Sequence, residues 1–101
     1  MIRRKRTEQR ERERAARKLV RDREKLAALS PGGSEQRPIH VMSASVVEVR
    51  VSHLPCPQCG GEYRVKEHRS ASSGVRAVDV TCVLCGTPRT LWFKLGSDEA
   101  N

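Results

Sequence analysis

The sequence predicts a small β domain that needs an internal cross-link, preceded by a long basic α-helix. Residues 7–29 are rich in Glu, Arg, Lys, Ala and Leu, which are good helix formers. Residues 45–95 carry segments in which apolar and polar residues alternate, as in half-buried strands. All four cysteines lie in this second segment. It is too short to bury a self-sufficient core, so the cysteines are expected to supply the missing stability.

Positive charge is concentrated at the N-terminal end of the chain. Residues 1–30 hold 12 Lys and Arg against 5 acidic residues, whereas residues 31–101 hold 8 against 7, and the whole chain carries +8. This asymmetry predicts a basic arm attached to a nearly neutral module. No run of about 18 apolar residues is present, so no membrane span is expected. The basic N-terminus lacks the apolar stretch of a secretory signal, so we expect a cytoplasmic protein, or a nuclear one in a eukaryote.

The arm is expected to be helical up to a clear stop signal. Glu8 stands four residues before Arg12, and Glu13 four before Arg17, which is the favourable order for helical ion pairs. The sequence Ser-Pro-Gly-Gly-Ser at residues 30–34 then ends the helix. We therefore expect a basic, largely helical arm at 1–30, a flexible linker at 31–44, a β domain at 45–95 and a disordered tail at 96–101.

Four strand patterns are expected within residues 45–95. The first is a strand from Ser45 in which Val47, Val49 and Val51 share one face. In the second strand, one face carries Tyr63, Val65 and Glu67, and the opposite face carries Arg64, Lys66 and His68. In the third strand one face carries Val78, Val80 and Cys82, and in the fourth one face carries Leu91, Phe93 and Leu95. Residues 70–74 form the expected turn before the third strand.

The cysteines form two Cys-x-x-Cys-Gly segments. Cys56 and Cys59 make the first pair, Cys82 and Cys85 the second, and 22 residues separate the pairs. Two intervening residues let a tight turn aim both sulfurs at one point, and the following Gly admits a positive φ. Two such turns, the first knuckle (residues 56–61) and the second knuckle (residues 82–87), supply four sulfurs for one tetrahedral metal ion. Since four thiolates leave no open coordination position, a structural rather than catalytic ion is expected.

Zinc is the expected metal, one ion per chain, and other uses of the cysteines fit less well. Iron in a rubredoxin-like site matches the ligand pattern, but those domains are rich in core aromatics and this chain has 3%. Disulfides need an export signal, and a redox motif needs a helix after the first cysteine. His53 and His68 are alternative ligands, more simply explained as ordinary surface or strand residues. No catalytic constellation stands out, so no enzymatic activity and no small-molecule substrate are expected.

Two segments carry a family resemblance. Leu-Pro-Cys-Pro-Gln-Cys-Gly-Gly at residues 54–61 and Thr-Cys-Val-Leu-Cys-Gly at residues 81–86 resemble the zinc-ribbon superfamily, over about residues 45–95. The resemblance implies three or four antiparallel strands with the metal held between the knuckles by Cys56, Cys59, Cys82 and Cys85. Such ribbons occur in transcription factors, RNA polymerase subunits, ribosomal proteins and adaptors. A basic tail before such a ribbon is similar to the Elf-type transcription elongation factors.

Nucleic acid, or a complex that contains it such as RNA polymerase or the ribosome, is the expected partner. A dense set of basic side chains can contact phosphates, and such affinity falls steeply with salt. Arg10, Arg14, Arg17 and Arg21 also share one helical face. Tyr63 or Trp92 could stack on an unpaired base, although both, with Phe93, are more readily explained as core or knuckle-covering residues. The candidate contact residues are Arg3, Arg4, Lys5, Arg6, Arg10, Arg14, Arg17, Arg21, Arg64, Lys66 and Arg89.

A protein-interaction adaptor is the alternative. In that case a narrow apolar stripe on the helix docks on a partner protein, because two heptads at best are too few for a stable homodimer. The stripe consists of Leu19, Val20, Leu26 and Leu29.

Overall fold

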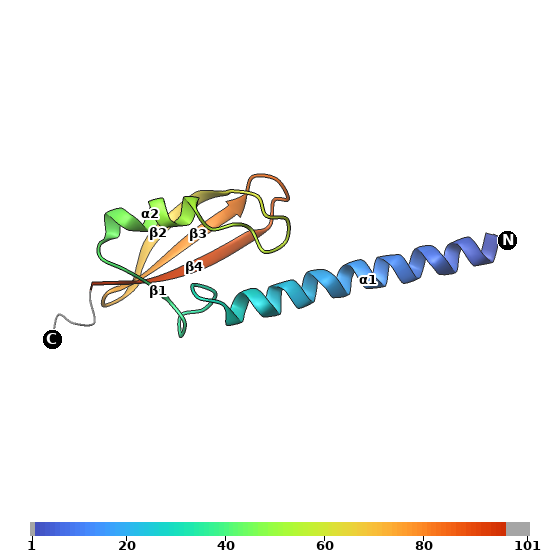
Figure 1. Ribbon diagram of the computed structural model, residues 1–101, viewed down its shortest axis with the longest axis horizontal. Helices are drawn as coiled ribbons and strands as arrows, with labels where there is room; N and C mark the ends of the chain where they lie inside the picture. Colours follow the sequence, from blue (N-terminus) through green and yellow to red (C-terminus); the bar gives the residue numbers. More distant parts are fainter. Residues whose placement is uncertain (1, 97–101) are drawn as a thin grey trace.

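The computed structural model describes residues 2–96, with side chains from Lys5 onward. The tail expected at 96–101 therefore lies outside the described residues except for Gly96. A single long helix, α1 (Ile2–Leu29), extends away from a small sheet domain, so the molecule measures 68 × 23 × 19 Å (Figure 1). The sheet domain contains β1 (Ile39–Val41), α2 (Ala44–Ser52), β2 (Tyr63–Ser72), β3 (Val75–Cys82) and β4 (Pro88–Leu95).

Helix α1 confirms the expected helical arm and ends where the stop signal predicts. The expected Glu8–Arg12 ion pair is present at 3.9 Å. At the C-terminal end, the Ser30 hydroxyl donates to the Leu26 carbonyl and the Arg37 guanidinium donates to the Leu29 carbonyl. These bonds satisfy carbonyls that have no partner within the helix. Among the described residues, no helix is both long and apolar enough to cross a membrane.

The sheet has the strand order β1-β4-β3-β2 and is mixed, which corrects the expectation of antiparallel strands alone. The β2–β3 and β3–β4 pairs are antiparallel, as expected, but β1 pairs with β4 in parallel, with Ile39 opposite Phe93. Strand β1 lies in the segment expected to be a flexible linker. Ile39 and Val41 are buried in the core, and the Trp92 N–H donates to the Gly32 carbonyl at 2.9 Å. The segment is thus fixed to the sheet by burial and hydrogen bonds.

The expected first strand is wrong: residues 44–52 form helix α2. The alternation of Val47, Val49 and Val51 indicated a strand with three residues on one face. In the helix, Val47 and Val51 lie four residues apart, so both are buried, whereas Val49 is 58% exposed. Residues four positions apart share one face in a strand and also in a helix, so the spacing of Val47 and Val51 fits both. The helix is favoured because it covers the open face of the sheet.

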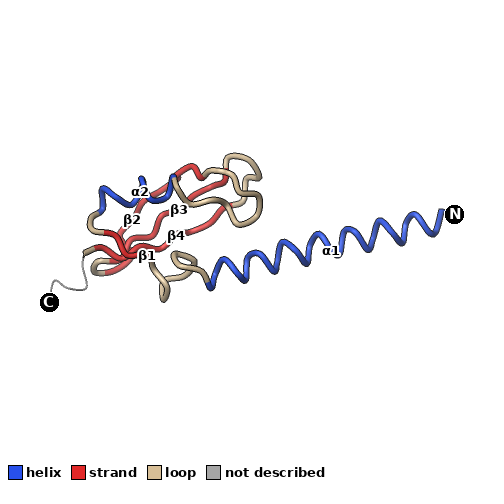
Figure 2. Tube along the Cα trace, viewed as in Figure 1, coloured by secondary structure: helices blue, strands red, loops and turns tan. Residues whose placement is uncertain are grey.

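Helix α2 covers one face of the sheet and closes the core. Figure 2 shows it lying along the strands on one side only. The core contains Phe93 and Leu91 from β4 and Val78 and Val80 from β3, together with the two buried valines of α2. The expected apolar faces of β3 and β4 are thereby confirmed, and Phe93 is a core residue.

Strand β2 is longer than expected and irregular. Its pairing with β3 shifts between Val65 and Glu67, so that Val65 faces Val80 while His68 faces Val78. This bulge moves His68 to the half-buried side and leaves Glu67 exposed. The expected sharing of one face by Tyr63, Val65 and Glu67 therefore holds only for the first two.

Candidate metal centre

The four cysteine sulfurs converge at one end of the sheet. The Sγ atoms of Cys56, Cys59, Cys82 and Cys85 all lie within 4.8 Å of one another. The close pairs run between the knuckles, at 3.8 Å for Cys56–Cys85 and 3.4 Å for Cys59–Cys82. In a tetrahedron with metal–sulfur bonds of about 2.3 Å, sulfurs lie about 3.8 Å apart. The group therefore has the donor set and size of a site for one metal ion.

Each knuckle is built by the same backbone hydrogen bonds. In the first knuckle, the Gly60 N–H donates to the Cys56 carbonyl at 2.7 Å, and the Cys56 N–H donates to the Gly61 carbonyl at 2.9 Å. In the second knuckle, 26 residues later, Gly86 and Thr87 make the equivalent bonds with Cys82, both at 3.0 Å. The Cys-x-x-Cys-Gly half-repeat of the sequence is thus a structural half-repeat.

Glycine is required in the knuckles for two different reasons. Gly60 has a φ of 78° and Gly86 a φ of 76°, in the left-handed region that costs other residues energy. At Gly61 the reason is close approach, because a Cβ there would lie 2.9 Å from Leu84 Cδ1 and 3.1 Å from Cys82 Sγ. This position lets the two knuckles pack against each other.

Hydrogen bonds within the turns favour the thiolate in the second knuckle. The Thr87 hydroxyl lies 3.1 Å from Cys85 Sγ and, with the Thr87 N–H, lowers the pKa of the Cys85 thiol to about 6. The Cys85 and Leu84 N–H groups lower the pKa of Cys82. At Cys59, the Gly61 N–H lowers the pKa, but the neighbouring Cys82 sulfur and burial outweigh it and raise the value to about 11. A divalent cation among the sulfurs would supply the positive charge that a full set of thiolates needs.

The two histidines considered as alternative ligands lie outside the sulfur group. Within the described chain, the four cysteines are the one cluster of possible ligands. The Nδ1 atom of His53 lies 2.8 Å from the Val49 carbonyl at the end of α2. His68 is half-buried on β2, and its Nε2 is buried without a hydrogen-bond partner. The four cysteines are not joined as disulfides.

Helix α1 is attached to the first knuckle through Gln58, which lies between its two cysteines. The Gln58 amide donates to the Val20 carbonyl at 3.0 Å and to Glu24 at 2.7 Å. In return, the Arg23 guanidinium donates to the Gln58 carbonyl at 2.7 Å. Ala27, one turn later, is buried. These contacts could not be predicted from the sequence, because a glutamine between two cysteines carries no periodicity.

Several basic residues are candidates for phosphate contact. Among those whose side chains the structure describes, Arg89 is the one that pairs closely with an acidic residue. Its two terminal nitrogens donate to the Glu24 carboxylate at 2.9 and 2.6 Å, and its side chain is 10% exposed. Hydrogen bonding by Arg89 lowers the pKa of Glu24. Arg89 therefore links β4 to α1, and Glu24 already balances its charge within the chain; its contact with phosphate stays a prediction.

The remaining basic candidates are exposed. On α1 these are Lys5, Arg6, Arg10, Arg14, Arg17 and Arg21, and on β2 they are Arg64 and Lys66. The side chains of Arg3 and Arg4 lie outside the described part of the structure. Tyr63 is half-buried beside Arg89, and Trp92 is half-buried on β4.

The expected apolar stripe of α1 is also exposed. Leu19 is 49% and Leu26 67% exposed, and Val20 and Leu29 are similarly open. Helix α1 instead bonds to the sheet domain through the side chains of Arg23 and Glu24 and the carbonyl of Val20.

The chain was compared with protein-family models, with curated proteins and with solved structures, and none of these matches it. The sulfur group and the mixed sheet therefore define the class of protein: a small, ribbon-like module whose cysteines could hold one metal ion.

Proposed function

We propose that this protein is a zinc-ribbon module that presents a basic helix to nucleic acid, with one zinc ion as its structural cross-link. The zinc assignment is supported by four sulfurs at near-tetrahedral spacing and by two knuckles of equal geometry. Four protein ligands leave no position for water or substrate, so the proposed role of the ion is not catalytic. Thiolate ligands need a reducing compartment, which favours the cytoplasm or, in a eukaryote, the nucleus.

The nucleic-acid proposal rests on how α1 is oriented. Glu24 bonds to Gln58 and Arg89 of the sheet domain, and Ala27, three residues later, is buried. Arg10, Arg14, Arg17 and Arg21, the basic face, are spaced four, three and four residues apart and lie on a neighbouring side of the helix. Attachment to the first knuckle therefore leaves the basic face open to solvent, where it can contact phosphates.

The dimensions of α1 suit a polyanion. Its 28 residues span about 42 Å at 1.5 Å per residue. Most of this length extends beyond the sheet domain, as Figure 1 shows. The sheet domain thus serves as a rigid base from which a basic helix projects. A basic segment before a ribbon is similar to the Elf-type elongation factors, and this resemblance favours a transcription complex as the setting.

A matched pair of double variants tests the proposal. Arg14→Gln with Arg21→Gln removes two charges from the basic face, and Lys18→Gln with Lys25→Gln removes two exposed charges that do not belong to the basic face, at the same seven-residue spacing. We expect fluorescence anisotropy with a short DNA duplex and with a single-stranded RNA to show a larger loss of affinity for the first variant. For this variant, the slope of log K against log salt concentration should be less steep by up to about 1.8, because two phosphate contacts are lost.

Two results would count against the proposal. If the native chain binds neither probe at about 50 mM salt, the basic face does not serve nucleic acid. Binding to a protein partner at unchanged affinity from about 50 to 300 mM salt would favour the adaptor instead. The exposed Leu19 and Leu26 are the observation that supports that second candidate.

A further inference from the structure

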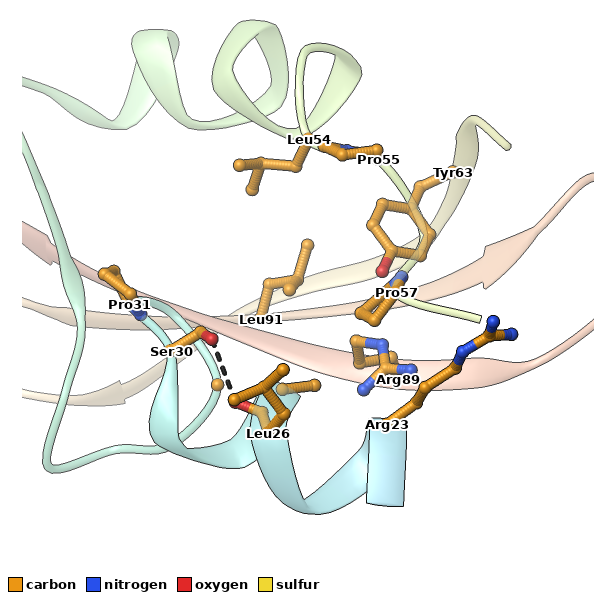
Figure 3. A pocket seen from close by; sticks show the side chains of 12 residues that line it. Arg23, Leu26, Ser30, Pro31, Leu54, Pro55, Pro57, Tyr63, Arg89 and Leu91 are labelled. Atoms are coloured by element: carbon orange, nitrogen blue, oxygen red, sulfur yellow. Dashed lines mark hydrogen bonds between the residues drawn. The ribbon is translucent and has the colours of Figure 1, made fainter. Parts of the chain in front are cut away.

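A cleft of about 360 Å³ lies between the last turns of α1 and the sheet domain. Figure 3 shows Leu26 of α1 on one side and Leu54 on the other, with Leu91 of β4 between them. Pro57 of the first knuckle and the ring of Tyr63 complete the apolar wall. The volume and mostly apolar lining are typical of sites that accept a ligand or a partner's side chain.

One end of this cleft is cationic. Arg23 and Arg89 both line it. Glu24 neutralises Arg89, but Arg23 bonds only to the Gln58 carbonyl, and no carboxylate of the described chain pairs with it. In addition, the Nε atom of Arg89 is buried without a hydrogen-bond partner. The cleft therefore combines apolar walls with one uncompensated positive charge.

We infer that this cleft binds a segment of a partner protein in which an apolar side chain stands next to an acidic one. The apolar side chain fills the space between Leu26, Leu54 and Leu91, and the carboxylate pairs with Arg23. Charge complementarity carries the choice of occupant, because a purely apolar segment leaves Arg23 without a counter-ion. A nucleic acid backbone supplies the anion but no aliphatic group for the apolar wall.

This site is separate from the basic face proposed for nucleic acid. The cleft uses Arg23 and Leu26, whereas the basic face uses Arg10, Arg14, Arg17 and Arg21, which project from another side of α1. The inference therefore stands or falls independently of the proposed function. Both partners could be held at once, which would make the chain a link between an acidic protein segment and a polyanion.

The test uses the full, metal-loaded chain and a fluorescein-labelled peptide, Ser-Glu-Phe-Asp-Glu-Ser. Two control peptides replace Phe by Ser, or the acidic residues by their amides. Leu26→Glu places a charge in the cleft. Leu19→Glu is the matched control, because it makes the same change seven residues away on the same side of α1 and outside the cleft. Both positions are exposed, so both variants should fold, which circular dichroism checks.

We expect the Phe-containing acidic peptide to bind and both control peptides to bind at least about tenfold more weakly. Leu26→Glu should weaken binding about tenfold or more, and Leu19→Glu less than about twofold. Amide shifts in an NMR titration should be largest at Leu54, Tyr63 and Leu91. The inference is overturned by equal losses in the two variants, by shifts confined to the basic face, or by no binding up to about 1 mM peptide.

Discussion

Glu24 of α1 and Arg89 of β4 form a two-pronged ion pair, at 2.9 and 2.6 Å, across 65 positions of sequence. It is a link by which the long helix is held against the sheet domain. Glu24 also accepts the Gln58 amide of the first knuckle. One carboxylate thus connects the arm, the sheet and the candidate metal centre.

Removing this carboxylate should loosen the arm. In Glu24→Gln the guanidinium of Arg89, 10% exposed, keeps its charge but loses its counter-ion. Because Glu24 is 40% exposed, the loss is screened, and we expect a cost on the order of 1 kcal/mol. Hydrogen exchange should become faster at the amides of residues 20–29 and stay unchanged in β3. Glu11→Gln, an exposed carboxylate on the same helix, is the control; equal effects of both changes would contradict this role.

The helical assignment of residues 44–52 makes a sharp prediction about three valines. Val47→Ala and Val51→Ala remove buried side chains and should each lower the free energy of unfolding by about 2 kcal/mol. Val49→Ala should be neutral or slightly stabilising, because Val49 is 58% exposed and Ala favours helix. Chemical denaturation of the three variants measures this. A strand would make all three losses similar, and that result would contradict the helix.

Replacing Gly86, the glycine with a positive φ in the second knuckle, should lower the stability of the knuckle. Gly86 has a φ of 76° with open space around its Cα, so the penalty for Gly86→Ala is conformational, about 1–2 kcal/mol. Since the knuckle must adopt this conformation to bring its sulfurs together, we expect zinc affinity to fall about 5- to 30-fold. Gly86→Asn should lose less, because Asn tolerates this region. Equal affinities for Ala and Gly in a chelator competition would contradict the account.

Tyr63 is the one tyrosine of the chain, so its ionisation can be followed directly by ultraviolet absorbance. Burial raises the pKa of Tyr63 to about 12. Because the folded pKa is above the unfolded value of about 10, the folded state holds the proton more tightly. Its contribution to stability is present below pH 10 and is lost as pH rises toward 12. The unfolded chain in denaturant is the control, and a midpoint near 10 in the folded protein would show that Tyr63 is not buried.

The parts of the fold that follow a local rule could be predicted from the sequence. The cysteine spacing predicts the knuckles, because two intervening residues and a glycine determine one turn geometry. The alternation in β3 and β4 predicts their buried faces, and the composition of residues 7–29 predicts α1. In each case the information lies within a few neighbouring residues.

The rest depends on contacts between distant segments. Residues 47 and 51 satisfy a strand period and a helix period equally, and only the uncovered face of the sheet decides between them. Strand β1 has three residues, too few for a pattern, and exists because β4 offers it an edge. The attachment of α1 through Gln58 and Glu24 joins residues 34 positions apart. No local signal in the sequence encodes such a pairing.

The central claim is that one zinc ion held by Cys56, Cys59, Cys82 and Cys85 stabilises the sheet domain. Zinc X-ray absorption spectroscopy on the purified full chain, combined with elemental analysis, tests it most directly. The account predicts one zinc per chain with four sulfur neighbours at about 2.3 Å, and loss of the dispersed amide spectrum of residues 39–95 when a chelator removes it. A metal-free chain that keeps this spectrum, or a zinc shell containing nitrogen or oxygen, would contradict it.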